Sequence, residues 1–191
     1  MLKYLGTPYM KENKETKDWL EELGEKFLHK VGLKKGQKVL DFGCGIGDYT
    51  IPAAKIVGGK GKVYALDKDG ESLKFLLGRA KRYGLENIEI IKTSGQLKIG
   101  LKDESLNMVL LYDVIHNSYF PGMEERKELF DEIHRVLRQY GIVSLYPKHA
   151  IAGDIKKEVE NARFSFARKF QTVLLHDSCL TKDYIFNFSK V

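Results

Sequence analysis

Five short, nearly continuous apolar runs alternate with stretches whose apolar residues recur at helical spacing, and this alternation strongly limits how the chain can fold. The runs cover residues 39–42, 63–67, 88–91, 108–113 and 142–146. Strands separated by helices pair in parallel, and strands that are apolar on both faces indicate a sheet covered on both sides. The pattern therefore predicts one α/β domain.

The two ends of the chain depart from this alternation. An amphipathic stripe over residues 16–31 predicts a helix capped at Thr16 and ended by Gly32. Residues 172–175 and 184–188 read as two strands with a short connection, which predicts an antiparallel hairpin. Further helices are expected over residues 48–57, over 73–80, from 129 to a stop near Gly141, and over 155–166.

Composition limits the class of protein. The 191 residues suit one domain, and 43% hydrophobic residues can form a core, which excludes general disorder. No apolar run approaches the roughly 20 residues of a membrane helix, and no apolar secretory segment is found, so we expect a cytoplasmic location. The net charge is +6. Because the basic residues are interleaved with Glu, a solvated surface is favoured over a nucleic-acid patch, and nucleic acid stays a possible partner. Two cysteines and no CxxC pair predict neither a disulfide framework nor a metal site.

The first apolar run ends in a glycine cluster, Gly-Cys-Gly-Ile-Gly, at residues 43–47. Alternating glycines let the backbone turn sharply and approach a ligand, and the following helix offers free N–H groups. A dinucleotide fingerprint would need its last glycine where Asp48 stands. Carboxylates at Asp41 and Asp48 repel phosphate and attract an ammonium or sulfonium group, so the loop suits a cofactor with an uncharged or cationic end.

A second acidic position follows the loop. Asp67 ends the next apolar run, and an acidic residue about 20 positions beyond such a loop accepts both hydroxyls of a ribose. The alternative is that Asp67 only caps the helix that follows. Together with the glycine loop, the ribose contact is favoured.

These motifs resemble those of the class I S-adenosylmethionine-dependent methyltransferases. Residues 39–47 are similar to the family's first motif, Asp67 to the acidic end of its second strand, and residues 106–116 to its fourth-strand motif. Residues 132–141 resemble the helix and turn before its fifth strand, and the final hairpin fits its reversed seventh strand. The resemblance runs from about residue 33 to the C-terminus and is nearest to the small-molecule branch that includes the quinone-biosynthesis C-methyltransferases.

The resemblance implies a fold, a cofactor and a division of the chain. The fold is a Rossmann-like doubly wound sheet of seven strands, mostly parallel, with an antiparallel C-terminal hairpin strand and helices on both faces. Residues 1–32 would form an N-terminal arm and lid helix, and residues 33–191 the S-adenosylmethionine-binding domain. The cofactor would be S-adenosylmethionine, left as S-adenosylhomocysteine once its methyl group has moved to a small-molecule acceptor.

The resemblance also assigns a cofactor site. Asp41 and the glycine loop would hold the methionine part, Asp67 the ribose, and Lys68 would lie along the adenine. The family often ends its third strand in a carboxylate that binds adenine, whereas here a Ser94 hydroxyl or a backbone carbonyl would have to substitute. The expected cofactor-binding residues are Asp41, Gly43, Cys44, Gly45, Gly47, Asp67, Lys68, Ser94, Gly95 and Asp113.

Methyl transfer needs few catalytic side chains. Methyl transfer is an in-line displacement, so orientation and removal of water supply much of the acceleration, and a base is needed only where the acceptor must lose a proton. The candidate catalytic residues are Tyr112, His116 and His149, which follow the fourth and fifth strands. The alternatives are a packing role for His116, an exposed loop for His149, and a loop or capping role for Asp113, which could otherwise meet an ammonium or an acceptor amine.

The acceptor class is narrowed by a motif that the sequence does not contain. Residues 112–115, Tyr-Asp-Val-Ile, differ from the Asn/Asp-Pro-Pro-aromatic run of enzymes that methylate amino groups in nucleic acids. A small molecule is therefore the leading acceptor. An RNA or protein acceptor and a non-catalytic cofactor-binding subunit remain alternatives, an NAD-dependent enzyme is disfavoured by the glycine spacing, and the oligomeric state is left open.

Overall fold

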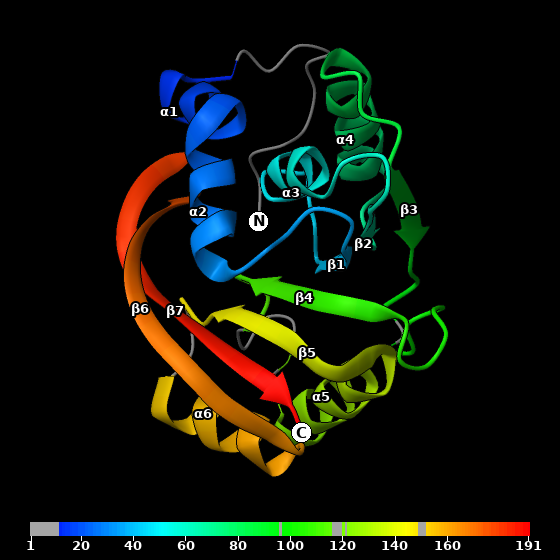
Figure 1. The fold of residues 1–191 in the computed structure, drawn as a ribbon, viewed down its shortest axis with the longest axis vertical. Coiled ribbons are helices and arrows are strands. Elements are labelled where there is room, and N and C mark those ends of the chain that lie inside the picture. The colour runs from blue at the N-terminus through cyan, green and yellow to red at the C-terminus, as the bar shows by residue number, and fades with distance from the viewer. Residues whose placement is uncertain (1–11, 96, 116–119, 121, 149–151) are drawn as a thin grey trace.

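A seven-stranded sheet forms the centre of the molecule, in the order β3-β2-β1-β4-β5-β7-β6 (Figure 1). The structure is a computed structural model that describes residues 12–95, 97–115, 120, 122–148 and 152–191. The strands are β1 (Lys38–Phe42), β2 (Lys62–Asp67), β3 (Ile88–Lys92), β4 (Leu106–Tyr112), β5 (Leu137–Tyr146), β6 (Phe164–His176) and β7 (Cys179–Lys190). Strands β1 to β5 pair in parallel and β7 runs antiparallel to both β5 and β6, which confirms the predicted fold class.

Helices cover both faces of this sheet. They are α1 (Lys14–Asp18), the π-helical turn η1 (Trp19–Leu23), α2 (Gly24–Val31), α3 (Thr50–Val57), α4 (Gly70–Arg82), α5 (Met123–Val136) and α6 (Ala152–Asn161). Figure 1 shows α2, α3 and α4 on one side of the sheet and α5 and α6 on the other. Two apolar clusters result, one containing Phe27, Ile51 and Leu76 and the other Ile133 and Val159. In the described part of the chain, no helix is both long and apolar enough to cross a bilayer.

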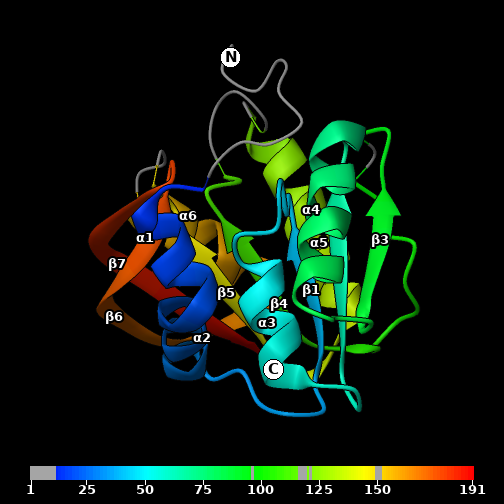
Figure 2. The ribbon, with the colours of Figure 1, turned by 90° about the horizontal axis from the view of Figure 1, so that it is seen from above.

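The strand order places a topological switch point at β1. Because β2 lies on one side of β1 and β4 on the other, the connections after these strands leave in opposite directions. Ligands of open α/β sheets bind at such a switch point, beyond the carboxyl ends of the strands. The arrow of β3 points to the top of Figure 2, so the carboxyl edge of the parallel strands lies there.

The first helix differs from the prediction at its start. Asn13, and not Thr16, is the cap, because its Oδ1 accepts the Thr16 N–H at 2.8 Å and Thr16 itself is buried in the first turn. The predicted end is confirmed, since Gly32 closes α2 with a φ of 113°. The next helix, α3, starts at Thr50, because Asp48 forms part of the preceding turn.

The junction of α5 and β5 also differs. The prediction carried the helix to Gly141, whereas α5 ends at Val136 and the chain enters β5 directly at Leu137. Tyr140 has a φ of 62°, and the pairing of β5 with β4 shifts register there. An irregularity of this kind bends a strand and hides it from pattern reading.

The C-terminal hairpin is much longer than predicted. Strands β6 and β7 meet at the turn formed by Asp177 and Ser178, whose φ values of 49° and 62° are typical of the two-residue turns that suit hairpins. Phe166, predicted as part of a helix, lies in β6, because α6 ends at Asn161. The central residues of β6 are mostly exposed, so the strand lacks the apolar run that would reveal it.

Candidate cofactor and acceptor site

The glycine loop folds over the carboxyl end of β2. The N–H groups of Gly43 and Cys44 both donate to the Leu66 carbonyl, at 2.8 and 3.0 Å. Gly43, Gly45 and Gly47 have φ values of 73°, 52° and 88°. Each lies in the left-handed region, which side chains other than glycine adopt at a cost of roughly 1–2 kcal/mol.

Only one of these glycines faces open space. A Cβ at Gly43 would lie 2.8 Å from Val114 Cγ2, and one at Gly47 would lie 2.2 Å from Leu76 Cδ1. Both glycines therefore allow the protein to pack against itself. A Cβ at Gly45 would meet nothing within 4 Å, so the middle of the loop has a bare surface that a ligand can cover.

Asp67 holds this bare surface in place. Its Oδ2 accepts the Gly45 N–H at 2.7 Å and its Oδ1 accepts the Asp69 N–H at 2.9 Å. The helix-capping role considered as the alternative for Asp67 is performed by Asp69, whose carboxylate accepts the Glu71 N–H at 3.1 Å. Asp67 is only half-buried and a carboxylate has about four acceptor sites, so it keeps capacity for the hydroxyls of a ligand.

Asp41 lies behind the loop. Its side chain is 3% exposed, and the Thr50 hydroxyl donates to its Oδ2 at 2.6 Å. Burial raises the pKa of Asp41 to about 7, and the Thr50 bond opposes part of that rise. Asp41 therefore joins β1 to the start of α3 and supports the loop from below. Cys44 is also buried, and burial raises the pKa of its thiol.

Asp48 does not contribute the negative field that the sequence suggested. The guanidinium of Arg79, a residue only 2% exposed, lies 2.6 Å from Asp48 Oδ1 and donates to the Ile46 carbonyl at 2.9 Å. The same guanidinium lies 2.9 Å from Glu12, which precedes α1. Arg82 also lies 2.9 Å from Glu12, so two guanidinium groups balance the carboxylates of Glu12 and Asp48, and this expectation is corrected.

The residues predicted near the adenine lie at the same edge of the sheet. Lys68, Ser94 and Gly95 are exposed and follow β2 and β3. The Thr93 N–H donates to the Asp67 carbonyl at 3.0 Å, which ties this segment to the end of β2. A Cβ at Gly95 would also meet nothing within 4 Å, so the segment is open where the prediction puts the adenine.

Tyr112 is buried at the predicted catalytic position. Its hydroxyl lies 2.7 Å from Ser144 Oγ, and its ring packs against Tyr49 and Phe27 with centroids 4.6 and 5.5 Å away. Burial raises the pKa of its hydroxyl. The end of β4 is covered on both faces, so this side chain points into the core and carries no hydroxyl to an acceptor. The other two candidates, His116 and His149, lie outside the described residues.

At this edge Asp113, a predicted cofactor-binding residue, pairs with His176, which the sequence prediction missed. His176 Nδ1 is 3.2 Å from Asp113 Oδ2, and the His176 ring meets the Tyr146 ring edge-on with centroids 5.9 Å apart. Asp113 follows β4 with a φ of 55°, and its N–H donates to the Tyr146 carbonyl at 3.2 Å. The Tyr49 hydroxyl, just after the glycine loop, donates to the Leu175 carbonyl at 2.6 Å. A hydrogen bond therefore connects the hairpin to the segment that follows the glycine loop.

A signal for His176 was present in the predicted topology. In the fold, β6 runs in the same direction as β5, because both are antiparallel to β7. The last residue of β6 must then lie at the carboxyl edge of the sheet, where ligands bind. A histidine that ends the first strand of such a hairpin is thus a site candidate.

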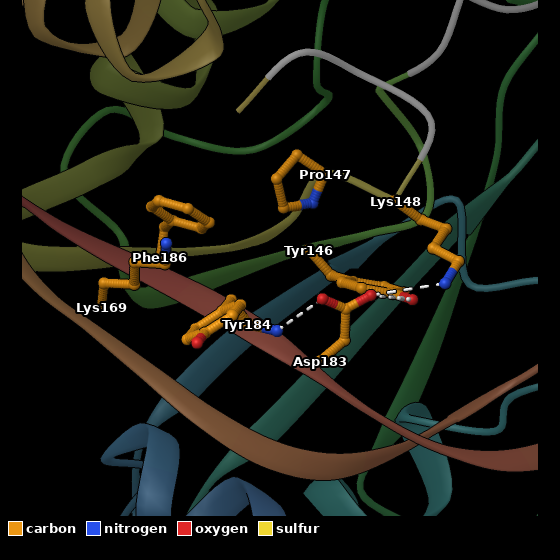
Figure 3. A pocket seen from close by; sticks show the side chains of 7 residues that line it. All are labelled: Tyr146, Pro147, Lys148, Lys169, Asp183, Tyr184 and Phe186. Atoms are coloured by element: carbon orange, nitrogen blue, oxygen red, sulfur yellow. Dashed lines mark hydrogen bonds and ion pairs between the residues drawn. The ribbon is translucent and has the colours of Figure 1, made fainter. Parts of the chain in front are cut away.

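A hollow of about 130 Å³ opens at the end of β5 (Figure 3). It is lined by residues 146–148 and by parts of β6 and β7. Asp183 Oδ2 accepts the Tyr146 hydroxyl at 3.3 Å and lies 3.3 Å from Lys148 Nζ, as Figure 3 shows. Among the described residues, no cluster of three or more His, Cys, Asp or Glu side chains could hold a metal ion.

The doubly wound sheet, its reversed last strand and the open glycine loop beside Asp67 are the combination found in Rossmann-like methyltransferases. A sequence model of the methyltransferase domain matches residues 33–188 of this chain. The chain belongs to the methyltransferase domain family, which confirms the resemblance.

Similar proteins come from several organisms. A probable cobalt-precorrin-6B C(15)-methyltransferase (decarboxylating) of Saccharolobus solfataricus is 30% identical over 122 residues, covering 63% of this chain and 57% of that protein. A demethylmenaquinone methyltransferase of Geobacillus stearothermophilus is 31% identical over 115 residues, covering 60% and 47%. The chain thus spans about half the length of these relatives.

The fold has a counterpart among solved structures. A SAM-dependent methyltransferase from Aquifex aeolicus superposes with a TM-score of 0.67 at 24% identity, covering 93% of each chain. The likeness extends over most of the described elements, so the arrangement of strands and helices is that of a methyltransferase fold.

Proposed function

We propose that this chain transfers a methyl group from S-adenosylmethionine to a small-molecule acceptor, and that it does so in the cytoplasm. The observation that carries the proposal is the bare face of Gly45, held by Asp67 at the switch point beside β1. Membership in the methyltransferase domain family supports the reaction class. The names of two relatives, a precorrin and a demethylmenaquinone methyltransferase, support a small-molecule acceptor.

The chain's own residues would bind and orient the methyl donor. The open surface of Gly45 would lie against the methionine part, and the remaining lone pairs of Asp67 would accept the ribose hydroxyls. Lys68, Ser94 and Gly95 would border the adenine. When bound, S-adenosylmethionine supplies a methyl group on a positively charged sulfur, which the acceptor takes by in-line displacement.

The reaction needs a general base only if the attacking atom of the acceptor must lose a proton. We assign that role to His176, because Asp113 orients its ring at the carboxyl edge of the sheet. A carboxylate near one ring nitrogen orients the ring and fixes its tautomer. The other nitrogen, Nε2, lies 3.6 Å from Oδ2 of the exposed Asp177 side chain. His116 and His149 stay predicted catalytic residues.

Calorimetric titration with S-adenosylmethionine, S-adenosylhomocysteine and NAD tests the proposal. We expect saturable binding of the two adenosyl compounds and none of NAD, because Asp48 stands where a dinucleotide fingerprint needs its last glycine. Binding of NAD alone would show that the cofactor is misassigned. If the folded protein binds neither S-adenosylmethionine nor S-adenosylhomocysteine, the proposed activity is contradicted.

A further inference from the structure

The hollow at the end of β5 indicates what kind of molecule accepts the methyl group. We propose that this hollow binds the anionic group of a large planar acceptor, and that Lys169 is the residue that recognises it (Figure 3). This inference rests on the proposed function, because it describes the acceptor of the same methyl transfer.

Lys169 offers a charge that the protein does not use. Its ammonium lies 4.0 Å from the centroid of the Tyr184 ring and 5.3 Å from that of the Phe186 ring. Contact with ring faces holds a cation in position without neutralising it. In the ranges that the structure describes, no carboxylate lies within ion-pair distance of Lys169, so its charge is available to an anion.

The second lysine of the hollow is already paired. Lys148 Nζ lies 3.3 Å from Asp183 Oδ2, and the Tyr184 N–H donates to the other oxygen of Asp183 at 2.8 Å. These two charges cancel, so the lining carries one net positive charge, on Lys169. Complementary charge selects partners and rejects wrong ones, which favours a carboxylate or another anion over a cation.

The rest of the lining favours a flat ligand. Tyr184 is 42% exposed and presents its ring to the hollow, and Pro147 and Phe186 add apolar surface beside it (Figure 3). Aromatic rings bind other planar rings by offset stacking or by edge contacts. The same ring that steadies the Lys169 ammonium can thus lie against a planar ligand.

The order of the strands sets the size of the acceptor. The methyl group would be transferred above the switch point between β1 and β4, and Lys169 belongs to β6, three positions beyond β4 along the sheet. At roughly 4.8 Å per neighbouring strand, the two points are separated by ~17 Å. The acceptor must therefore carry its anionic group on the order of 15 Å from the methylated atom.

Fluorescence titration with pyrenebutyrate, a planar carboxylate, tests this inference on the full chain in the presence of S-adenosylhomocysteine. We expect saturable binding that Lys169→Gln weakens about three- to fivefold, the size of one exposed charge pair. Lys169→Arg should keep most of the affinity. Lys182→Gln, an exposed lysine of β7 outside this hollow, should leave it unchanged. Pyrenebutanol, the neutral analogue, should not distinguish Lys169→Gln from the unmodified protein.

Several results would overturn the inference. They are an absence of saturable pyrenebutyrate binding, equal affinity for Lys169→Gln and the unmodified protein, or an equal loss with pyrenebutanol. Titration of S-adenosylhomocysteine on the same protein separates the two proposals. A protein that binds S-adenosylhomocysteine but ignores the charge at Lys169 contradicts this inference alone, whereas failure to bind S-adenosylhomocysteine contradicts the proposed function.

Discussion

A single carboxylate, that of Asp67, serves both the protein and the proposed ligand. It fixes the Gly45 N–H and retains acceptor capacity at the carboxyl edge of the sheet. The sequence predicted a role in ligand binding from its position, but not the bond to the loop, because that bond depends on how the glycines turn. Removing Asp67 should thus loosen the loop and remove acceptors for the ribose.

Asp67→Ala should weaken binding of S-adenosylhomocysteine by about 1–3 kcal/mol, measured by calorimetry, because charge-assisted hydrogen bonds are lost. Asp69→Ala is the matched control, since Asp69 caps α4 and makes no bond to the glycine loop. The control should lose about 1 kcal/mol of stability and keep its affinity. Unchanged affinity in Asp67→Ala would remove Asp67 from the site.

The buried carboxyl of Asp41 makes stability depend on pH. Burial raises its pKa to about 7 in the folded protein from 3.8, so its contribution to stability is fully present below pH 3.8 and is lost as the pH rises through 7. Asp41→Asn removes this titration. At pH 8 the variant should be more stable than the unmodified protein by on the order of 1–3 kcal/mol.

Urea unfolding at pH 8 and at pH 5 measures this difference. At pH 5 the advantage of Asp41→Asn should be smaller, because Asp41 is then largely protonated in the folded protein. An equal advantage at both pH values would contradict a raised pKa of Asp41 in the folded protein.

Tyr112 marks a limit of prediction at the residue scale. Its position after a strand suggested a catalytic hydroxyl, but the side chain turns into the aromatic cluster with Tyr49 and Phe27. The pairing of Asp113 with His176 joins residues far apart in the sequence, so no local pattern contained it. Position along a strand is readable from a sequence, whereas the direction of a side chain at a strand end depends on tertiary packing.

At the scale of the element, the glycines of the loop have two different roles. Gly43 and Gly47 allow close packing within the protein, whereas Gly45 leaves a surface open for a ligand. Gly45→Leu should abolish binding of S-adenosylhomocysteine, because the new side chain would occupy the open face of the loop. Gly58→Leu is the matched control, since Gly58 also has positive φ and open space but lies at the end of α3. Gly45→Leu should lose roughly 1–2 kcal/mol of stability from backbone strain. Gly58→Leu should lose at least as much, about 1–3 kcal/mol, because a φ of 63° with a ψ of −175° is a conformation that essentially only glycine adopts.

Calorimetry and thermal unfolding of the two variants test this distinction. Retained binding in Gly45→Leu would show that the ligand does not lie on the loop. Loss of binding in Gly58→Leu as well would trace the effect to general strain and not to the loop surface.

Strands were predictable where their residues form an apolar run, whether the strand is buried or half-exposed. The parallel strands β1 to β5 have such runs, and the prediction found each of them to within one residue of its carboxyl end. The hairpin strand β6 was found only over its last part, because the exposed residues before it give no apolar pattern. Its length matters for the proposed acceptor site, since Lys169 lies in the part that was not predicted.

At the scale of the whole molecule, the sheet order brings together residues that the sequence keeps apart. Reversal of β7 turns the end of β6 to the same edge as the glycine loop, so His176 and Asp67 share one side of the molecule. The resemblance predicted seven strands and a reversed hairpin, and both are confirmed. The division into an arm of residues 1–32 and a domain of residues 33–191 stays a prediction.

A crystal structure of the chain with S-adenosylhomocysteine most directly tests the central claim, that the open loop at Gly45 binds an adenosyl methyl donor. We expect the thioether chain against Gly45, the ribose hydroxyls on Asp67 and the adenine beside Lys68 and Ser94. Density for the nucleoside in another part of the molecule, with the loop at Gly45 uncovered, would contradict it.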